Sequence, residues 1–518
     1  MKVRPSPLFL LGVLAIFNVA GLQSQTDVFD AIAESHELAG MSVATRCGES
    51  LQMEAHVGLR DIDRNLPVTS ETTFRMASIS KAVVALAVAK LADSGTLAYD
   101  APLSNYMDTP PVHPDHPDVG LTLEHLLTHT SGIRDGDGYG DFLNASYANI
   151  PSVPALSEVL SETGTYYTDN MWGNSEPGEW FQYANLNFGV LATVMEAATG
   201  MRFDLLMEEL LFAPYGLDAG YRVQQLDNIN DLAVLYRQSS GEWTPQADQF
   251  EGVMPMGPDW TPYLPGTSAV CFSPQGGLRI SARDMTVLAR LWGAGEATGA
   301  DGQALTFLSA GSLSALHEEK WAYDGGNGNN YYGLFNSWGQ GVHRAASGLG
   351  ADEILPDVTV SPFIGHPGEA YGLISDAYAT PDGSWSFCFA TNGKWDGYSV
   401  GPASGYYQVE QDVFAALRND FLACQASGVP EVQAPAVHLL GQPRVGDTLL
   451  HFGGTDIEFA VFDLLRLDGR KVAECNVMDQ GQAGTLTLKV GPLEFGWHVG
   501  RLTTSEGTAS RLTFFVGH

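Results

Sequence analysis

The hydrophobic pattern of residues 27–426 predicts a mixture of helices and strands. Residues 28–38 and 78–93 have helical patterns, and the second segment is apolar on nearly every face, as in a helix buried at the centre of a domain. Residues 41–59 are predicted to form two strands with a turn at 47–50. Strands near both ends of the segment, with helices between them, predict one sheet built by both ends. Further helices are expected at 121–128, 186–199, 281–293 and 408–421, and strands at 373–378 and 385–391.

Two later stretches depart from this pattern. Residues 134–178 are rich in Gly, Asn, Tyr, Ser and Pro, with weak periodicity, and we expect a long ordered loop that walls a binding site. Residues 426–436 have the composition of a linker, and the helical signal ends there. Alternating apolar and polar runs follow, with a hairpin signal at Asp468-Gly469. They predict a small all-β module over residues 437–518.

The first 24 residues have the pattern of a signal peptide. Lys2 and Arg4 precede an apolar stretch from Leu8 to Ala20, which is shorter than the roughly 20 residues that span a bilayer. A short membrane anchor is the alternative. We therefore expect export through the periplasm to the cell surface or the medium, with no stable membrane span. The main domain is then expected over residues 25–425.

Charge and cysteine content exclude several classes of partner. The chain has 60 acidic and 26 basic residues, a net charge of −34, which repels nucleic acids and anionic membranes. Its five cysteines contain no CxxC pair, which argues against a zinc site or an iron–sulfur cluster. An odd number leaves at least one thiol free. No metal or organic cofactor is therefore expected.

A candidate nucleophile lies at the start of the apolar segment 78–93. Ser78 and Lys81 are three residues apart, so they share one face of the helix. A lysine buried at the positive end of a helix has a lowered pKa, and its neutral amine can take the proton of a serine hydroxyl. The alternative is a serine that caps the helix beside a solvated lysine. A helix that is apolar all round offers Lys81 no face toward water, which favours the first interpretation.

Two more motifs strengthen this interpretation. Tyr183-x-Asn185 precedes an apolar helix, and His366-Pro367-Gly368 precedes a strand. With Ser78-x-x-Lys81, they make the sequence resemble the serine β-lactamase and penicillin-binding superfamily, in its branch of class C β-lactamases, DD-peptidases and esterases. The resemblance extends from about residue 28 to 420. It includes the phrases at 67–80, 126–133 and 276–284.

The resemblance implies a fold and a set of roles. The fold is of the α/β class, an antiparallel sheet flanked by helices plus a helical subdomain. Ser78 is implied as the nucleophile that forms an acyl-enzyme, with Lys81 and Tyr183 as the proton relay. Either of the two can be the base, and the sequence leaves this open. Asn185 would bind an amide of the substrate and Lys81, and His366 would orient Tyr183 or the leaving group.

The same resemblance places an oxyanion hole at the backbone N–H groups of Ser78 and Glu369, directly after Gly368. Glu369 departs from the family pattern, in which relatives that act on β-lactams tend to carry Ser or Thr. Its carboxylate would repel an anionic substrate if it faces the cleft. The alternative is a side chain that points away. In the first case, neutral or amine-bearing substrates are expected to outrank penicillins.

Other candidate sites are weaker. His125 and His129 have the i, i+4 spacing of metal ligands, but no HExxH glutamate lies between them, and a structural role is expected. The acidic residues of 134–142 lack the order of a calcium-binding loop and are interpreted as solvated loop acids.

The C-terminal module, residues 437–518, resembles the sorting domain of the bacterial type IX secretion system. The resemblance rests on Val461-Phe-Asp, Asp468-Gly-Arg470 and Gly496-Trp-His-Val. The usual basic last residue is absent, and a generic β-sandwich or carbohydrate-binding module is the alternative. A β-sandwich is expected in either case, with secretion machinery as a partner in the first.

These features together predict a secreted serine hydrolase. It would act through a Ser78 acyl-enzyme on esters, on peptides or amides of D-amino acids, or on β-lactams. The alternative is a penicillin-binding or sensor protein that is acylated with little or no turnover. The sequence does not choose the substrate, because specificity depends on loops such as 134–178 that have no readable code.

Overall fold

The computed structural model describes residues 27–426, except for 151, 346–351, 356–357 and 359–361, and the backbone of eight strands beyond residue 437. The predicted signal peptide at 1–24 and most of the predicted linker lie outside the described residues. The chain divides into two compact units. The first contains residues up to Ala297 and Thr306–Cys424; the second contains Thr298–Leu305 and Gln425 onward.

The described residues of the first unit form an antiparallel sheet of nine strands. Its centre pairs strands from opposite ends of the unit, with Met41 opposite Thr391 and Cys47 opposite Trp385. The predicted sheet built by both ends is therefore confirmed. In sheet order the strands are β10 (Trp321–Ala322), β11 (Ser337–Trp338), β12 (His343–Ala345), β13 (Phe363–Ala370), β14 (Leu373–Ala379), β15 (Trp385–Thr391), β1 (Gly40–Cys47), β2 (Ser50–Asp61) and β3 (Leu66–Pro67).

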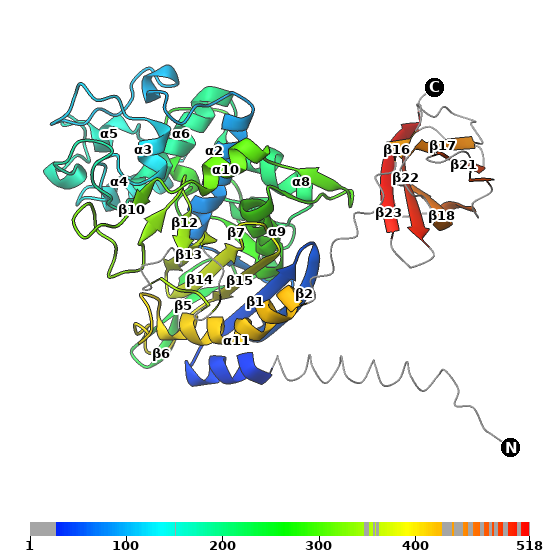
Figure 1. Ribbon diagram of the computed structural model, residues 1–518. Helices are drawn as coiled ribbons and strands as arrows, with labels where there is room; N and C mark the ends of the chain where they lie inside the picture. Colours follow the sequence, from blue (N-terminus) through cyan, green and yellow to red (C-terminus); the bar gives the residue numbers. More distant parts are fainter. Residues whose placement is uncertain are drawn as a thin grey trace. The chain divides into compact units, whose positions relative to one another are not determined.

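Helices cover both faces of this sheet (Figure 1). On one face, α11 and the helical residues 27–35 pack their apolar side chains against β1, β14 and β15. On the other face, α9 packs against the same strands, and α2 packs against β13. A disulfide between Cys47 and Cys424 joins β1 to α11, and Cys271 and Cys388 are free and buried. The helices used below are α2 (Ile79–Asp93), α3 (Leu123–Leu127), α4 (Tyr139–Ala148), α5 (Ser157–Leu160), α6 (Leu186–Thr199), α9 (Ala282–Ala294) and α11 (Gln408–Ala426).

Helix α2 is the buried central helix that the sequence predicted. Twelve of its fifteen residues are buried, and its apolar side chains contact helices as well as the sheet. Lys81 is among the buried residues, with no exposed surface. A lysine in such a place needs hydrogen-bond partners supplied by the protein, because burial removes the water that would solvate its charge.

The prediction of a loop over 134–178 is wrong in part. The segment contains the ten-residue helix α4 and the short helix α5. Only Phe142 and Ser146 of α4 are buried, so the helix lacks the apolar stripe that reveals a helix in sequence.

The His366-Pro367-Gly368 motif precedes β14, which agrees with the predicted strand at 373–378, but the motif itself lies within β13, a strand that the sequence did not predict. Glycine and proline lower strand propensity, but pairing with β14 holds the segment extended, with His366 opposite Ala377. Proline is tolerated here because β12 pairs only with the first residues of β13, Phe363 to Gly365. The later residues of β13 therefore form an open edge of the sheet on that side, where no backbone N–H is needed from proline.

The second unit is described by its backbone. Its strands from residue 438 onward form two four-stranded sheets, in the orders β16-β17-β21-β20 and β19-β18-β22-β23. The predicted hairpin turn at Asp468-Gly469 lies outside the described residues, but the strands on either side of it pair antiparallel. The strands are β16 (His438–Leu439), β17 (Leu449–Gly453), β18 (Phe459–Arg466), β19 (Lys471–Cys475), β20 (Asp479–Gln480), β21 (Thr485–Lys489), β22 (Gly496–Thr504) and β23 (Ala509–Val516).

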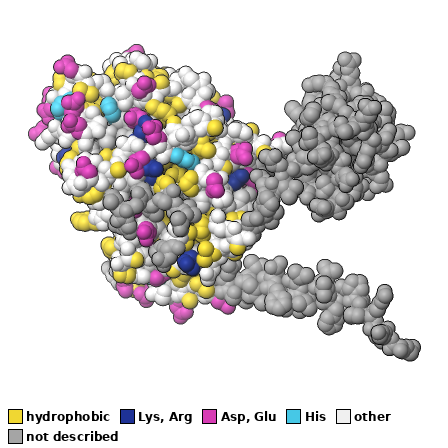
Figure 2. All heavy atoms as spheres, viewed as in Figure 1, with side chains coloured by type: hydrophobic (Ala, Val, Ile, Leu, Met, Phe, Trp, Pro, Cys, Tyr) yellow, Lys and Arg dark blue, Asp and Glu magenta, His cyan; other side chains and the backbone are white. Residues whose placement is uncertain are grey.

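No helix in the described part of the chain has both the length and the apolar character needed to cross a bilayer. Acidic side chains spread over the face shown in Figure 2, with few lysine or arginine side chains between them. This surface agrees with the net charge of −34.

Candidate active site

Three elements that are distant in sequence meet around a cavity of about 470 Å³. The start of α2, the loop before α6 and the strand β13 each carry one of the predicted motifs. Lys81 lies directly behind Ser78, and its Nζ is 3.0 Å from Ser78 Oγ. The structure therefore brings together all the residues that the sequence singled out. Those that line the cavity are Ser78, Tyr183, Asn185, His366, Gly368 and Glu369.

The amine of Lys81 is held by three oxygen atoms. Besides Ser78 Oγ, its Nζ donates to Asn185 Oδ1 at 2.7 Å and to the carbonyl of Gln275 at 2.8 Å. Burial lowers the pKa of Lys81 to about 7, and the negative charge of Asp135 opposes this shift. A substantial fraction of Lys81 is therefore neutral near pH 7, which is the state that can accept a proton.

Tyr183 lies on the other side of Lys81. The Nζ of Lys81 is 4.8 Å from the centre of the Tyr183 ring, and the ring stacks on Phe335 at 5.5 Å. Burial raises the pKa of the Tyr183 hydroxyl, although its hydrogen bond with Ser78 opposes this. Tyr183 is therefore a neutral phenol in the resting site. Of the two groups that the sequence left open as the base, Lys81 has the pKa that suits the role.

His366 is oriented by its neighbour in β13. Its Nδ1 donates to the carbonyl of Pro367, which leaves Nε2 as an acceptor 3.4 Å from the hydroxyl of Tyr183. Burial, together with the charge of Lys81, lowers the pKa of His366 well below its usual value. A neutral imidazole with this tautomer can receive the hydroxyl proton of Tyr183 in a hydrogen bond.

Gly368 allows β13 to approach the start of α2. A Cβ atom at this position would lie 2.4 Å from Ser375 Oγ, 2.6 Å from the carbonyl of Met76 and 3.3 Å from the backbone nitrogen of Ser78. No side chain fits there. The residue before the nucleophile, Ala77, has a φ of 45°, so the backbone is also strained where α2 begins.

The backbone N–H of Glu369 belongs to the open edge of β13. Ile374, its partner in β14, donates its own N–H to Thr391 Oγ1 on the opposite side. In an antiparallel ladder this makes Glu369 and Ile374 a pair without mutual hydrogen bonds, so the N–H of Glu369 points away from β14. Both N–H groups predicted for the oxyanion hole, those of Ser78 and Glu369, thus belong to residues that line the cavity.

Asp135 is a site residue that sequence reasoning missed. Its Oδ2 accepts from the backbone N–H and the side-chain amide of Asn185, both at 2.8 Å, and its Oδ1 accepts from the N–H of Leu186 at 3.0 Å. These bonds fix Asn185 so that its Oδ1 faces Lys81. Asp135 is an exposed loop acid, as expected, but the sequence did not predict that it positions Asn185. Its position just after the phrase at 126–133 is the only available signal, and it does not separate Asp135 from its acidic neighbours.

His129 supports the site from behind. Its Nδ1 accepts the N–H of Ala184 at 3.1 Å, and its ring lies 4.4 Å from that of Tyr183. His125 instead accepts the N–H of Thr122 at the start of α3. Among the described residues, no group of three or more His, Cys, Asp or Glu side chains is arranged to hold a metal ion.

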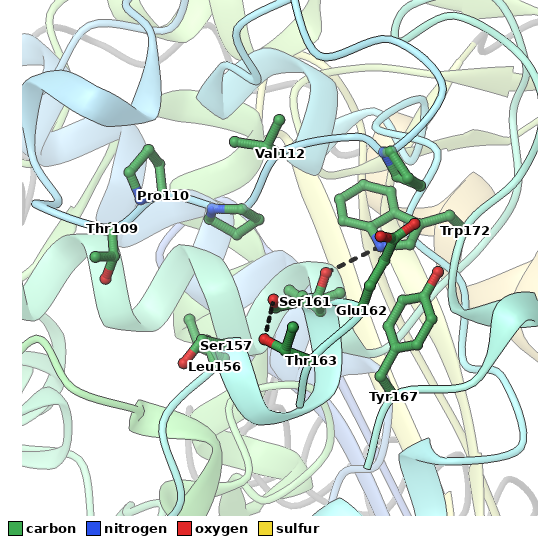
Figure 3. Close-up of a pocket in the computed structure, with 13 residues that line it drawn as sticks. Thr109, Pro110, Val112, Leu156, Ser157, Ser161, Glu162, Thr163, Tyr167 and Trp172 are labelled. Atoms are coloured by element: carbon green, nitrogen blue, oxygen red, sulfur yellow. Dashed lines mark hydrogen bonds between the residues drawn. The ribbon is translucent and has the colours of Figure 1, made fainter. Parts of the chain in front are cut away.

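A second cavity, of about 500 Å³, is formed by residues 109–114 and 156–172 (Figure 3). Trp172 lies in its wall and donates its ring N–H to the carbonyl of Leu160 at 3.2 Å. None of the residues that line the first cavity lines this one.

Comparison with known proteins agrees with this geometry. Penicillin-binding protein 4* of Bacillus subtilis is 28% identical over 191 residues, which are 37% of this chain and 39% of that protein. Esterase EstB of Burkholderia gladioli is 30% identical over 250 residues, which are 46% of this chain and 61% of the esterase. The chain thus spans less than two thirds of either relative.

A solved structure shares the fold. The D-amino acid amidase of Ochrobactrum anthropi SV3 superposes with a TM-score of 0.52 at 18% identity, over 77% of this chain and 99% of the amidase. The family model named beta-lactamase matches residues 26–397, which contain all three motifs and the whole of β13. The chain therefore belongs to the beta-lactamase family.

Proposed function

We propose that the protein is a serine hydrolase that works through an acyl-enzyme on Ser78. The observation that carries this proposal is the contact between Ser78 and Lys81, a buried amine with a pKa of about 7. In its neutral form, Lys81 has two N–H donors and one lone pair. The donors match Asn185 Oδ1 and the carbonyl of Gln275, and the lone pair then faces the hydroxyl of Ser78.

The first step follows from this arrangement. Lys81 takes the proton of Ser78 as Oγ attacks the substrate carbonyl. The N–H groups of Ser78 and Glu369 stabilise the charge that develops on the carbonyl oxygen. Ser78 is the first residue before α2, so the positive end of the helix dipole adds to this stabilisation.

Tyr183 serves the leaving group in this mechanism. Its hydroxyl is neutral, so it can donate a proton to the departing alcohol or amine, and the phenolate that this leaves takes a proton from the Lys81 ammonium, which returns to the neutral amine. His366 Nε2 holds the hydroxyl in position. Water then attacks the acyl-enzyme, and its proton returns along the same groups to regenerate Ser78 and the neutral amine.

The relatives support several candidate substrate classes. An esterase and a penicillin-binding protein among the relatives support esters, D-amino-acid peptides or amides, and β-lactams as candidates. A protein that is acylated without turnover is the alternative, as in a sensor.

Labelling and turnover distinguish the hydrolase from the sensor. A fluorescent fluorophosphonate should label the wild type and not Ser78→Ala, and a p-nitrophenyl ester should be hydrolysed in multiple turnovers by the wild type alone. Stable labelling with a single burst of product would favour the sensor. Labelling that survives in Ser78→Ala would overturn the mechanism.

We further propose that the protein is exported. The disulfide between Cys47 and Cys424 supports this, because disulfides persist in oxidising compartments. We propose that the C-terminal module is the sorting domain that directs secretion. Mass spectrometry of the exported protein should show loss of the first 20 to 25 residues, roughly the length of a signal peptide. Deletion of 437–518 should leave an active enzyme that stays with the cells; an intact N-terminus, or unchanged secretion of the truncated protein, would contradict the proposal.

A further inference from the structure

The wall of the catalytic cavity that lies across the edge of the sheet from Ser78 is acidic. We call Glu369, Glu410 and Asp376 the acid wall. Glu369 and Glu410 both line the cavity, and Asp376 lies in the neighbouring strand β14. Glu410 comes from the first turn of α11, so the wall joins two elements that are distant in sequence.

The side chain of Glu369 does not point away from the cavity. It is exposed, and its Oε2 accepts a hydrogen bond of 2.9 Å from the hydroxyl of Tyr407, which also lines the cavity. No arginine or lysine pairs with it among the described residues. The contact holds the carboxylate in place without neutralising its charge.

Behind it, two carboxyl groups are buried together. Asp376 has no exposed surface, and its carboxyl group shares a hydrogen bond with the carboxyl group of Glu410. Its neighbour is the carboxyl group of Glu410, which is 4% exposed and accepts the backbone N–H of Tyr407. Burial raises the pKa of both, that of Glu410 to about 8. At pH 7 this pair therefore holds its protons, and Glu369 carries the negative charge of the wall.

No lysine or arginine is among the described residues that line the cavity, and Lys81 is engaged behind Ser78. The other lining side chains include aromatic rings, whose faces attract cations. The rings are those of Tyr331, Tyr332, Phe335 and Tyr407.

From these contacts we propose that the acid wall binds an ammonium group of the substrate, so that the enzyme selects esters or amides whose acyl part carries a primary amine. The proposal rests on the proposed acyl-enzyme mechanism. Glu369 provides both its N–H, at the proposed oxyanion hole, and its carboxylate. Because both groups belong to one residue, an amine on the acyl side of the reacting carbonyl can reach the carboxylate while the carbonyl oxygen lies in the proposed oxyanion hole. A carboxylate in the same place meets like charge.

Three alanine p-nitroanilides that differ in charge test this at pH 7. The free amine is cationic, the N-acetyl derivative neutral and the N-succinyl derivative anionic, and D and L forms of each are compared. We expect kcat/KM to fall at least roughly tenfold from the cationic to the neutral compound, and further for the anionic one. Added salt should narrow the difference, because it screens the exposed Glu369.

Glu369→Gln is the decisive variant, because an exposed side chain can be changed without loss of folding. It should lower kcat/KM for the cationic compound about tenfold relative to kcat/KM for the neutral compound. Glu209→Gln removes an equal charge from an exposed position that does not line the cavity, and should change neither value.

The outcomes separate this inference from the proposed function. The proposed role of the acid wall would be overturned by equal rates for all three compounds, or by a Glu369→Gln variant that lowers the rates for the neutral and cationic compounds alike. Either result would leave the proposed acyl-enzyme mechanism intact. Failure of Ser78 to react with fluorophosphonate would instead overturn the function itself.

Discussion

At one end of the cavity, the reacting groups are held by several hydrogen bonds; at the other end, an exposed carboxylate has no cation beside it among the described residues. Lys81 is surrounded by three oxygen atoms, and Asn185 is fixed by Asp135. Across the edge of the sheet, Glu369 accepts a hydrogen bond from Tyr407, and behind it Asp376 and Glu410 share a hydrogen bond. Both ends belong to the same cavity and the same fold.

The difference teaches what each end is built to do. Hydrogen bonds that are complete before substrate arrives keep reacting groups in one geometry, as catalysis of a chemical step requires. A carboxylate that has no cation beside it can pair with a cationic ligand, so the site binds cationic ligands in preference to anionic ones. The chemical end is therefore expected to tolerate little change, and the acid wall to alter substrate preference alone. Four experiments sharpen or break this comparison.

The largest effect is expected at the chemical end. Ser78→Ala and Lys81→Ala should each lower kcat by at least about a thousandfold, because residues that act as a unit lose their effect together. Thermal unfolding should confirm that each variant folds. Near-normal hydrolysis by Ser78→Ala would show that the nucleophile is elsewhere.

Asp135→Asn should have the next largest effect. Loss of the carboxylate frees the amide of Asn185 to rotate away from Lys81, and a misplacement of this kind costs roughly a hundredfold in kcat, with KM little changed. Asp135 also raises the pKa of Lys81, so its removal should move the pH profile to lower pH. Asp137→Asn, at an exposed position in the same loop, is the matched control. A fall in kcat without a shift of the profile would indicate a merely structural role.

The pH dependence follows from Lys81. Its pKa is lowered to about 7, so below that pH it carries a proton and cannot accept one from Ser78. With a neutral ester, kcat/KM should rise about tenfold per unit between pH 5 and 6 and level off above pH 7. Circular dichroism over the same range controls for unfolding. A profile that rises only near pH 10 would point to Tyr183 as the base.

The smallest effect is expected at the acid wall with an anionic β-lactam. Like charges at ~4 Å repel by about 4 kcal/mol at an effective dielectric of 20, and even a quarter of this disfavours nitrocefin several-fold. Glu369→Ser should therefore raise kcat/KM for nitrocefin several-fold and leave a neutral p-nitrophenyl ester unchanged. Efficient nitrocefin hydrolysis by the wild type, with no gain in Glu369→Ser, would show that the acid wall does not face the substrate.

Much of the fold was predictable because its signals are local. The predicted helix at 186–199 agrees with α6, and that at 78–93 agrees with α2, because strongly apolar segments of helical length leave few alternatives. The helix α4 was missed because its residues are mostly exposed, so its hydrophobic residues do not recur with the period of a helix. The strand β13 was not predicted because glycine and proline mask a segment that tertiary pairing keeps extended.

The sequence by itself pointed to the candidate reacting groups. The period of the helix places Ser78 beside Lys81 whatever else the chain does, and each of the other two motifs spans three residues. Only the tertiary structure decided their surroundings. Asp135, Glu410 and Asp376 come from three separate parts of the chain, and burial, which sets the pKa of Lys81 and raises that of Glu410, exists only after those parts pack together.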